Sequence, residues 1–227
     1  MKNILITGHS SGFGYELSKI FTEKGYNVVG ISRSISDSVD TNIQCDFSDL
    51  ENINQIEIPK LDYEYVILNA GILGEIKKNI DISIEEYTQV FNINFFSNKI
   101  ILDKLFSSNK EIKNVIGISS GAAHKTYFGW SQYCSSKSAF KQLISSYSDE
   151  YTDSKFISLS PGIMKTKMQD KIFNVDEIDF PSVSKFKKLY VNGMETPLKI
   201  ANKFVKNIDN ILEENNSGSF FDMRDIE

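Results

Sequence analysis

The sequence is poor in the residues that stabilise small secreted proteins or bind metal ions: it has two cysteines, two histidines and four prolines in 227 residues. Cys45 and Cys134 alone cannot form a disulfide framework. No apolar run approaches the roughly 18 residues that a membrane-spanning helix requires, and no secretory signal precedes the opening "MKNILITG". We therefore expect a protein of the reducing cytoplasm.

Positive charge is not in excess either. The 25 lysines and arginines are outnumbered by 30 aspartates and glutamates, which gives a formal net charge of −5. This balance does not favour general nucleic-acid binding. His9 and His124 lack the order of nucleophile, base and acid that a catalytic triad needs, so we interpret both as bystanders. We expect no metal, nucleic-acid or membrane partner.

Short apolar runs alternate with amphipathic segments along the chain. The runs predict seven strands, at residues 3–7, 26–32, 42–46, 63–71, 114–120, 155–162 and 218–223. Helices are predicted between the first strand and Gly25, and at residues 83–106, 131–151 and 196–214. Such alternation gives parallel pairing through right-handed crossovers. The sequence therefore predicts one α/β domain over residues 1–227, with a doubly wound, mainly parallel sheet and helices on both faces.

Residues 164–195 interrupt this alternation with charged and aromatic side chains. An insertion near the end of the sixth strand is where such a fold carries a substrate lid, and we predict one here. The lysines of the segment lie at positions 165, 167 and 171 and in the run "SKFKK" at 184–188. We interpret them as a solvated helix face rather than as an anion site.

The segment "ITGHSSGFG" joins the first strand to the first helix. Gly8, Gly12 and Gly14 allow a tight turn and a close approach of the backbone to a pyrophosphate, which a helix N-terminus also favours. The hydroxyls of Ser10 and Ser11 add hydrogen-bond donors. Because the turn follows the first strand and opens an amphipathic helix, it predicts a dinucleotide site.

The end of the second strand indicates which dinucleotide binds. Proteins that bind NAD generally have an acid there, on the ribose 2′-hydroxyl. This chain has Ser32 at that place and Arg33 next to it. A guanidinium can bind a 2′-phosphate through two hydrogen bonds, so the pair favours NADP(H) over NAD(H). The alternative interpretation is that Arg33 is an ordinary surface residue.

Five motifs occur in order: "TGHSSGFG", "NAG", "ISS", "YCSSK" and "PGIMKT". In this order and at these spacings, they resemble the short-chain dehydrogenase/reductase family over residues 2–224. The segments "YFGWSQYCSSK" and "GSFFDMRD" are similar to its branch of sepiapterin reductases and bacterial benzil reductases. The resemblance implies a single Rossmann-fold domain with oxidoreductase activity.

The resemblance also implies four catalytic residues. Tyr133 is the general acid that protonates a carbonyl oxygen, and Lys137 lowers the pKa of its phenol and binds the nicotinamide ribose. Ser120, 13 residues before Tyr133, hydrogen-bonds the reacting oxygen. Asn94 holds a water in the proton relay, with Ser97 in place of the glycine that the family pattern has three residues on.

Further implied contacts belong to the cofactor. Asp46 accepts a hydrogen bond from the adenine, and the "PGIMKT" segment holds the nicotinamide carboxamide. A helix cap at Asp46 and a plain turn at residues 161–162 are the structural alternatives. The predicted cofactor-binding residues are Gly8, Ser10, Ser11, Gly12, Phe13, Gly14, Ser32, Arg33, Asp46, Phe47, Asn69, Ala70, Gly71, Tyr133, Lys137, Pro161, Gly162, Ile163 and Thr166.

The segment before Tyr133 is aromatic. Tyr127 and Trp130, with Met164 and Met168 opposite, are candidate substrate contacts that favour an aromatic or diketone substrate; packing in the core or at an interface is the alternative. We predict an NADPH-dependent carbonyl reductase. The alternatives are an NADP-linked alcohol, polyol or sugar dehydrogenase working oxidatively, and a dinucleotide-sensing protein without turnover. The resemblance implies a homodimer through the helices after the fourth and fifth strands.

Overall fold

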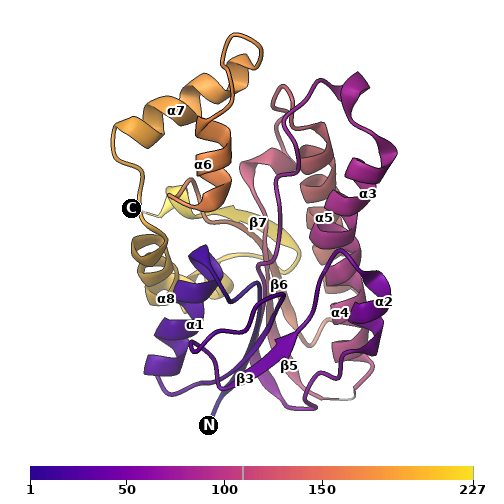
Figure 1. Ribbon diagram of the computed structural model, residues 1–227. Helices are drawn as coiled ribbons and strands as arrows, with labels where there is room; N and C mark the ends of the chain where they lie inside the picture. The colour runs from indigo at the N-terminus through magenta and orange to yellow at the C-terminus, as the bar shows by residue number, and fades with distance from the viewer. Residues whose placement is uncertain (109, 227) are drawn as a thin grey trace.

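The computed structural model describes residues 1–108 and 110–226. Within these residues, seven parallel strands form one sheet in the order β3-β2-β1-β4-β5-β6-β7. The sheet runs through the middle of the molecule between two layers of helices (Figure 1). This architecture confirms the doubly wound α/β fold predicted from the sequence.

The strands lie where the apolar runs predict them, and most are shorter than the runs. They are β1 (Asn3–Thr7), β2 (Asn27–Ser32), β3 (Thr41–Gln44), β4 (Tyr63–Leu68), β5 (Ile112–Ile118), β6 (Lys155–Ser160) and β7 (Ser219–Asp222). The predicted fourth and sixth strands extended past Leu68 and Ser160. The residues beyond these ends leave the sheet and form loops at its carboxyl edge, where the backbone amides of Asn69 and Ala70 donate to the Thr7 side-chain hydroxyl instead of continuing the ladder.

Helices α1 (Gly12–Glu23) and α8 (Pro197–Glu214) cover one face of the sheet. The other face carries α2 (Leu50–Gln55), α4 (Ser97–Phe106) and α5 (Ser131–Glu150), with α3 (Ile84–Phe91) packed on α5 (Figure 1). Among the described residues, no helix has both the length and the apolar character needed to span a bilayer.

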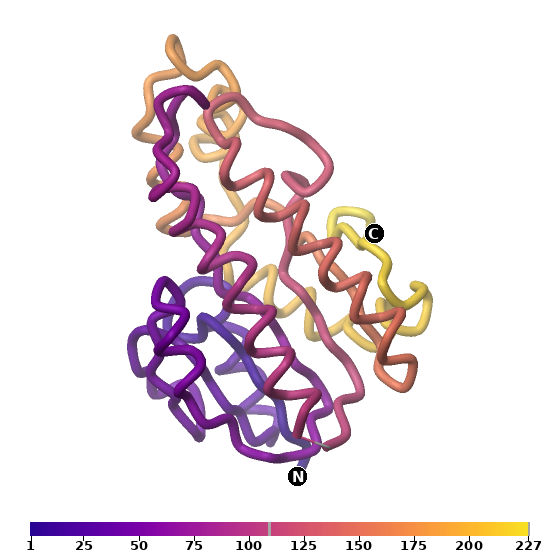
Figure 2. The backbone as a smooth tube through the Cα atoms, turned by 90° about the vertical axis from the view of Figure 1, so that its right-hand side faces the viewer, coloured from indigo at the N-terminus to yellow at the C-terminus, as the bar shows by residue number. Residues whose placement is uncertain are grey.

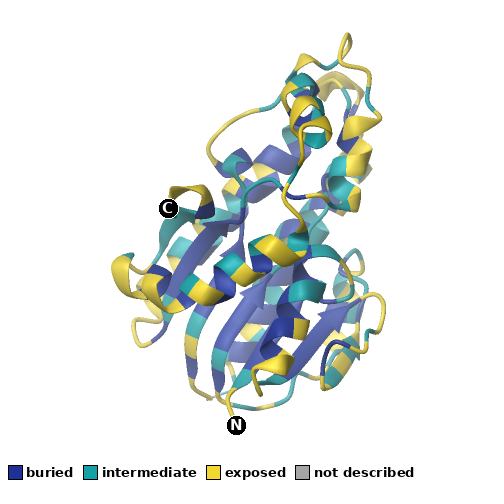
Figure 3. Cartoon of the chain, turned by 90° about the vertical axis from the view of Figure 1, so that its left-hand side faces the viewer, coloured by how far each residue is buried: buried dark blue, intermediate teal, exposed yellow. Residues whose placement is uncertain are grey.

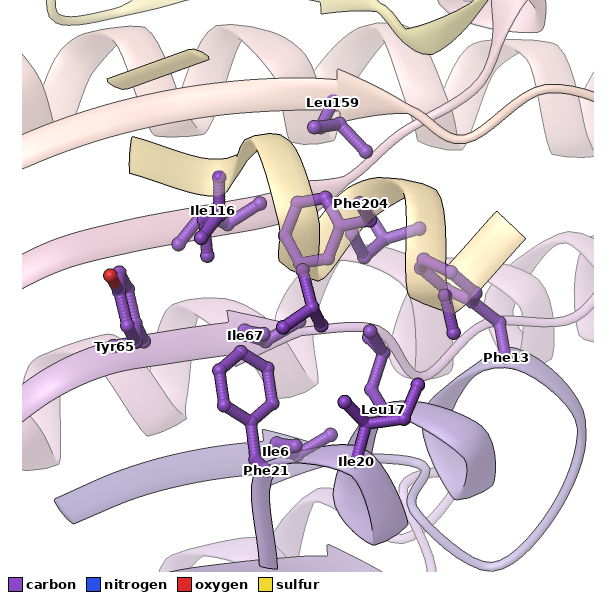
Figure 4. Packing of buried hydrophobic residues seen from close by; sticks show 14 of the residues in the cluster. Ile6, Phe13, Leu17, Ile20, Phe21, Tyr65, Ile67, Ile116, Leu159 and Phe204 are labelled. Atoms are coloured by element: carbon purple, nitrogen blue, oxygen red, sulfur yellow. The ribbon is translucent and has the colours of Figure 1, made fainter. Parts of the chain in front are cut away.

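Strand β1 shows how the two cores form. Its side chains alternate between the faces of the sheet, so Ile4 and Ile6 pack on the α1 side while Leu5 packs on the α5 side. On the α1 side, Phe13, Leu17 and Phe21 meet Phe204 of α8 across the sheet surface (Figure 4). The central strands are buried almost throughout, between helices whose outer surfaces are exposed (Figure 3).

The helix predicted at residues 83–106 is interrupted. Ser83 caps α3 in a capping box with Glu86. A π-helical turn, η2 (Asn92–Phe96), then separates α3 from α4. The interruption contains neither proline nor glycine, so the sequence carried no signal for it. Such turns often occur at functional sites.

Residues 164–195 rise from the carboxyl edge of the sheet, outside both helical layers (Figures 1 and 2). They contain α6 (Lys167–Phe173), the 3₁₀ turn η4 (Pro181–Val183) and α7 (Ser184–Val191). A β-bridge between Met164 and Glu195 brings the two ends of this segment together. Its function as a substrate lid stays a prediction. Shorter 3₁₀ turns are η1 (Asn79–Asp81), η3 (Gly121–Ala123) and η5 (Met223–Asp225).

Candidate active site

The loops at the carboxyl ends of the strands enclose a cavity of about 1130 Å³. Ligands of open α/β sheets bind at this edge. Ser120, Tyr133 and Lys137 line the cavity, as do all four predicted substrate residues and every predicted cofactor-binding residue except Gly14. The structure therefore brings together residues from the loops after β1, β2, β4, β5 and β6.

The glycine turn packs α1 tightly against the end of β1. Gly8 and Gly12 have φ angles of +69° and +58°, which favour glycine. A Cβ atom on Gly14 would lie 2.3 Å from the Gly8 carbonyl oxygen, so Gly14 acts beneath the turn rather than in the cavity. Among the described residues, no side chain caps α1 and no acid lies in its first turn. Its N-terminal amides can therefore bind a phosphate.

Ser32, Arg33 and Asp46 lie at the predicted adenosine end of the cavity. Ser32 is buried at the end of β2, and Arg33 beside it is exposed. The backbone amide and hydroxyl of Ser48 donate to Asp46 Oδ1 over 2.9 and 2.7 Å, and these bonds lower the pKa of Asp46. The helix cap of α2 is Asp49, not Asp46. Asp46 is therefore an ionised acceptor beside the cavity.

The loop after β4 passes between the glycine turn and α5. Asn69 Nδ2 donates to the carbonyl oxygens of Thr7 and Gly8, over 3.0 and 3.2 Å. A Cβ atom on Gly71 would lie 3.3 Å from both Asn94 Oδ1 and Lys137 Nζ. A larger residue here would press on both side chains. The glycine turn, the ionised Asp46 and this glycine together fit a dinucleotide.

Tyr133 and Lys137 lie one turn apart on α5 because their spacing of four residues places them on one helix face. Both side chains are buried, with exposed fractions of 7% and 4%. Lys137 Nζ donates to the Ile118 carbonyl oxygen over 2.8 Å and lies 6.0 Å from the centre of the Tyr133 ring. Ser120, at the end of the loop after β5, accepts from the Ala122 amide and caps η3.

Burial determines the acid–base properties of this pair. It raises the pKa of Tyr133 to about 12, an effect that a hydrogen bond with Ser120 opposes, and it lowers the pKa of Lys137 to about 8. A buried site disfavours the charged form of each group, so the two pKa values move apart from ordinary values of 10.0 and 10.5. From the sequence we expected Lys137 to lower the Tyr133 pKa; in this geometry the lysine donates to the Ile118 carbonyl, and desolvation dominates.

Asn94 lies in the π-helical turn and is fully buried. Its Nδ2 donates to the Ile72 carbonyl and to the Ser136 hydroxyl, over 2.9 Å each, and its Oδ1 accepts from the Ile72 amide over 2.8 Å. The side chain therefore holds the loop after β4 against α5 and does not line the cavity. Asn92 is turned away and donates to Ser48.

The predicted substrate residues form an aromatic and thioether wall. The ring centroids of Tyr127 and Trp130 lie 4.9 Å apart, and those of Trp130 and Phe186 of α7 are also 4.9 Å apart. The same rings pack in a hydrophobic cluster that joins α7 to α5. These side chains therefore pack together and also line the cavity with Met164 and Met168, and their contact with a substrate stays a prediction.

Several cavity residues were missed by sequence reasoning. Arg224 lies in the C-terminal segment, where the sequence predicted no site residue, and Phe186 in a stretch without periodicity. Four lysines of residues 164–195 are exposed, in agreement with a solvated face, and also line the cavity; they are Lys165, Lys167, Lys171 and Lys185. Charge density in the segment was the available signal. His9 is fully buried and hydrogen-bonds Asn42 Oδ1 through Nε2 over 2.9 Å, so its role is structural.

A family model described as "short chain dehydrogenase" matches residues 2–177, and the chain belongs to this family. A benzil reductase ((S)-benzoin forming) of Bacillus subtilis is 30% identical, and the alignment covers 100% of both chains. A protein of the same name from Bacillus cereus is 25% identical, over 92% of this chain and 94% of its own. These relatives fit the benzil reductase-like branch indicated by the sequence.

Solved structures show the same fold. The short-chain dehydrogenase/reductase YIR035C of Saccharomyces cerevisiae has a TM-score of 0.84 at 24% identity, covering 100% of this chain and 97% of its own. A 4-hydroxyisoleucine dehydrogenase complexed with NADH has a TM-score of 0.79 at 21% identity, and the match covers 98% of this chain and 96% of its own. A Shigella flexneri short chain dehydrogenase complexed with NADP has a TM-score of 0.76 at 20% identity, covering 98% and 97%. The last two structures thus contain different dinucleotides, NADH in one and NADP in the other.

Proposed function

We propose that this protein is an NADPH-dependent reductase that converts a ketone or diketone of small size to an alcohol. The observation that carries the proposal is the meeting of Ser120, Tyr133 and Lys137 on one wall of the cavity. The glycine turn and Arg33 line the same cavity. The names of the Bacillus relatives support a diketone as the substrate class.

In the proposed reaction, the carbonyl oxygen accepts hydrogen bonds from the Ser120 hydroxyl and the Tyr133 phenol. Because the pKa of Tyr133 is about 12, the phenol stays protonated near neutral pH and donates its proton to the developing alkoxide. Lys137, with a pKa of about 8, lies one turn away and can replace that proton. When bound, the reduced nicotinamide supplies the hydride to the carbonyl carbon. Asn94 keeps the loop after β4 in place beside Lys137.

The preference for NADPH is supported by the residues at the end of β2. Ser32 and Arg33 line the cavity there, where an acid would repel a 2′-phosphate. The exposed guanidinium of Arg33 can bind the phosphate through two parallel hydrogen bonds.

The homodimer belongs to the same proposal. Helices α4 and α5 lie on the same face of the sheet (Figure 1). Leu102 and Phe140 are buried against that sheet and cannot take part, whereas Ile100, Phe106 and Leu143 are only partly buried. Light scattering after gel filtration should give twice the chain mass of 25.8 kDa. A monomer mass at micromolar protein concentration would contradict the proposed homodimer.

The test of the function follows NADPH oxidation through the absorbance of the reduced nicotinamide. The panel contains benzil, a second aromatic diketone, sepiapterin, a simple aldehyde and a 3-ketoacyl thioester, each repeated with NADH. We expect turnover of the diketones with NADPH and much slower turnover with NADH. Absence of turnover across the panel, with NADPH still bound, would overturn the reductase assignment and leave the fold and the dinucleotide site standing.

A further inference from the structure

Arg224 occupies a position beside the reacting groups that the reaction just described does not use. It lies in η5 at the C-terminal end of the chain and lines the same cavity as Ser120. A Cβ atom on Gly162 would lie 3.6 Å from Arg224 Cγ, and one on Gly121, the residue after Ser120, would lie 3.7 Å from Arg224 Nη2. The arginine side chain therefore lies against the loops after both β5 and β6.

The guanidinium is held in one orientation by Asp222 of β7. Arg224 Nε donates to Asp222 Oδ1 over 2.8 Å, and Arg224 Nη2 donates to Asp222 Oδ2 over 2.5 Å. Two parallel bonds of this kind fix the plane of the group. A guanidinium has five N–H donors, and Asp222 is its only hydrogen-bond acceptor among the residues that the structure describes. With 56% of the Arg224 side chain exposed, the remaining donors are available to a ligand in the cavity.

The surroundings of Arg224 select the kind of acceptor. Asp222 neutralises the guanidinium, so a carboxylate at this place would be repelled by the aspartate, whereas a neutral carbonyl oxygen would not. The Tyr127 hydroxyl lies 4.0 Å from the same Cβ position on Gly121 and offers a second donor. The rings of Tyr127 and Trp130 form the adjoining wall. An oxygen next to an aryl group matches both features.

We propose that Arg224 is a specificity-determining residue that donates hydrogen bonds to a second carbonyl oxygen of the substrate. The preferred substrates are then 1,2-diketones with aryl substituents, in which one carbonyl is reduced at Ser120 and Tyr133 while the other is held at Arg224. This inference rests on the proposed reductase function.

The test compares benzil with deoxybenzoin, which has the same two phenyl rings and a single carbonyl group. We expect Arg224→Gln to lower kcat/KM for benzil by about 10- to 100-fold, the usual effect of losing a hydrogen bond from a charged donor. Turnover of deoxybenzoin should change by less than about threefold, because its single carbonyl makes no use of the guanidinium. Arg224→Lys keeps the charge without the planar fork and should lose less on benzil.

Lys203→Gln is the matched control. Lys203 Nζ donates to the Ile226 carbonyl oxygen over 2.8 Å, so this variant loosens the same C-terminal segment without removing a cavity residue. It should leave the ratio of kcat/KM for benzil to kcat/KM for deoxybenzoin unchanged. The thermal midpoint and the Kd for NADPH of each variant report whether the fold and the dinucleotide site are intact.

The outcomes separate the inference from the function. If Arg224→Gln lowers kcat/KM equally for both ketones, or does not lower it for benzil, the inference is overturned and the proposed reductase function stands. If Arg224→Gln lowers kcat/KM for phenylglyoxylate, an α-keto acid, more than for benzil, Arg224 binds a carboxylate. That result overturns the proposal that it binds the second carbonyl of a diketone. If the unmodified protein reduces neither ketone with NADPH but reduces another compound of the carbonyl panel, this inference falls and the reductase stands. Absence of turnover across the whole panel removes both.

Discussion

Asn94 in the π-helical turn donates a hydrogen bond of 2.9 Å to the hydroxyl of Ser136, which directly precedes Lys137 on α5. Both residues are fully buried. The bond therefore links two helices at the level of Lys137, and Asn94 also joins the backbone of Ile72. The side chain thus connects three separate segments around Lys137.

Replacing Asn94 by alanine should cost about 3 kcal/mol of unfolding free energy, since it removes three hydrogen bonds and leaves the partly buried Ile72 amide and carbonyl without their partner. Ser136→Ala removes one bond of the same network and should cost about 1 kcal/mol. Urea unfolding of both variants measures the difference. Equal costs for the two would show that the Ile72 bonds do not stabilise the fold.

Tyr133→Phe tests the general acid. The variant keeps the buried ring but removes the proton that the phenol donates to the alkoxide, so turnover should fall by at least about 100-fold. The Kd for NADPH, measured by nicotinamide fluorescence, should change little. If the variant keeps appreciable turnover, Tyr133 is not the general acid.

The pKa of Lys137 predicts how stability depends on pH. It falls from 10.5 to about 8 on folding, so between these pH values the unfolded chain binds more protons at this residue than the folded chain does. Lys137 therefore destabilises the folded state most below about pH 8. This destabilisation decreases as the pH rises to about 10.5.

Lys137→Met removes this contribution and should stabilise the protein more at pH 7 than at pH 10. Lys141→Met, one turn further along α5, is the matched control and should show no such difference. Denaturant unfolding at both pH values provides the measurement. If Lys137→Met changes the unfolding free energy equally at pH 7 and pH 10, the lowered pKa of Lys137 is contradicted.

Arg33→Asp tests the choice of cofactor. It places a carboxylate beside the proposed 2′-phosphate site and should weaken NADPH binding by about 100-fold or more, while NADH binding changes by only a few-fold. Titrations of nicotinamide fluorescence give both Kd values. Losses of equal size would show that Arg33 does not recognise the phosphate.

Much of the site was predictable because it depends on short stretches of chain. Tyr133 and Lys137 share a helix face through their spacing alone. The glycine turn depends on local φ angles and on the helix that follows it. The order of strands and helices followed from apolar periodicity, and the parallel sheet followed from that order.

Only the tertiary structure decided the remaining features. Arg224 reaches Gly121 because β7 pairs with β6 at the edge of the sheet, and the pKa values of Tyr133 and Lys137 depend on how far packing excludes water. The sequence by itself thus determined the family motifs and the elements that carry them, because these depend on neighbours along the chain. Contacts between distant segments, and the burial that they produce, leave no periodic pattern in the sequence.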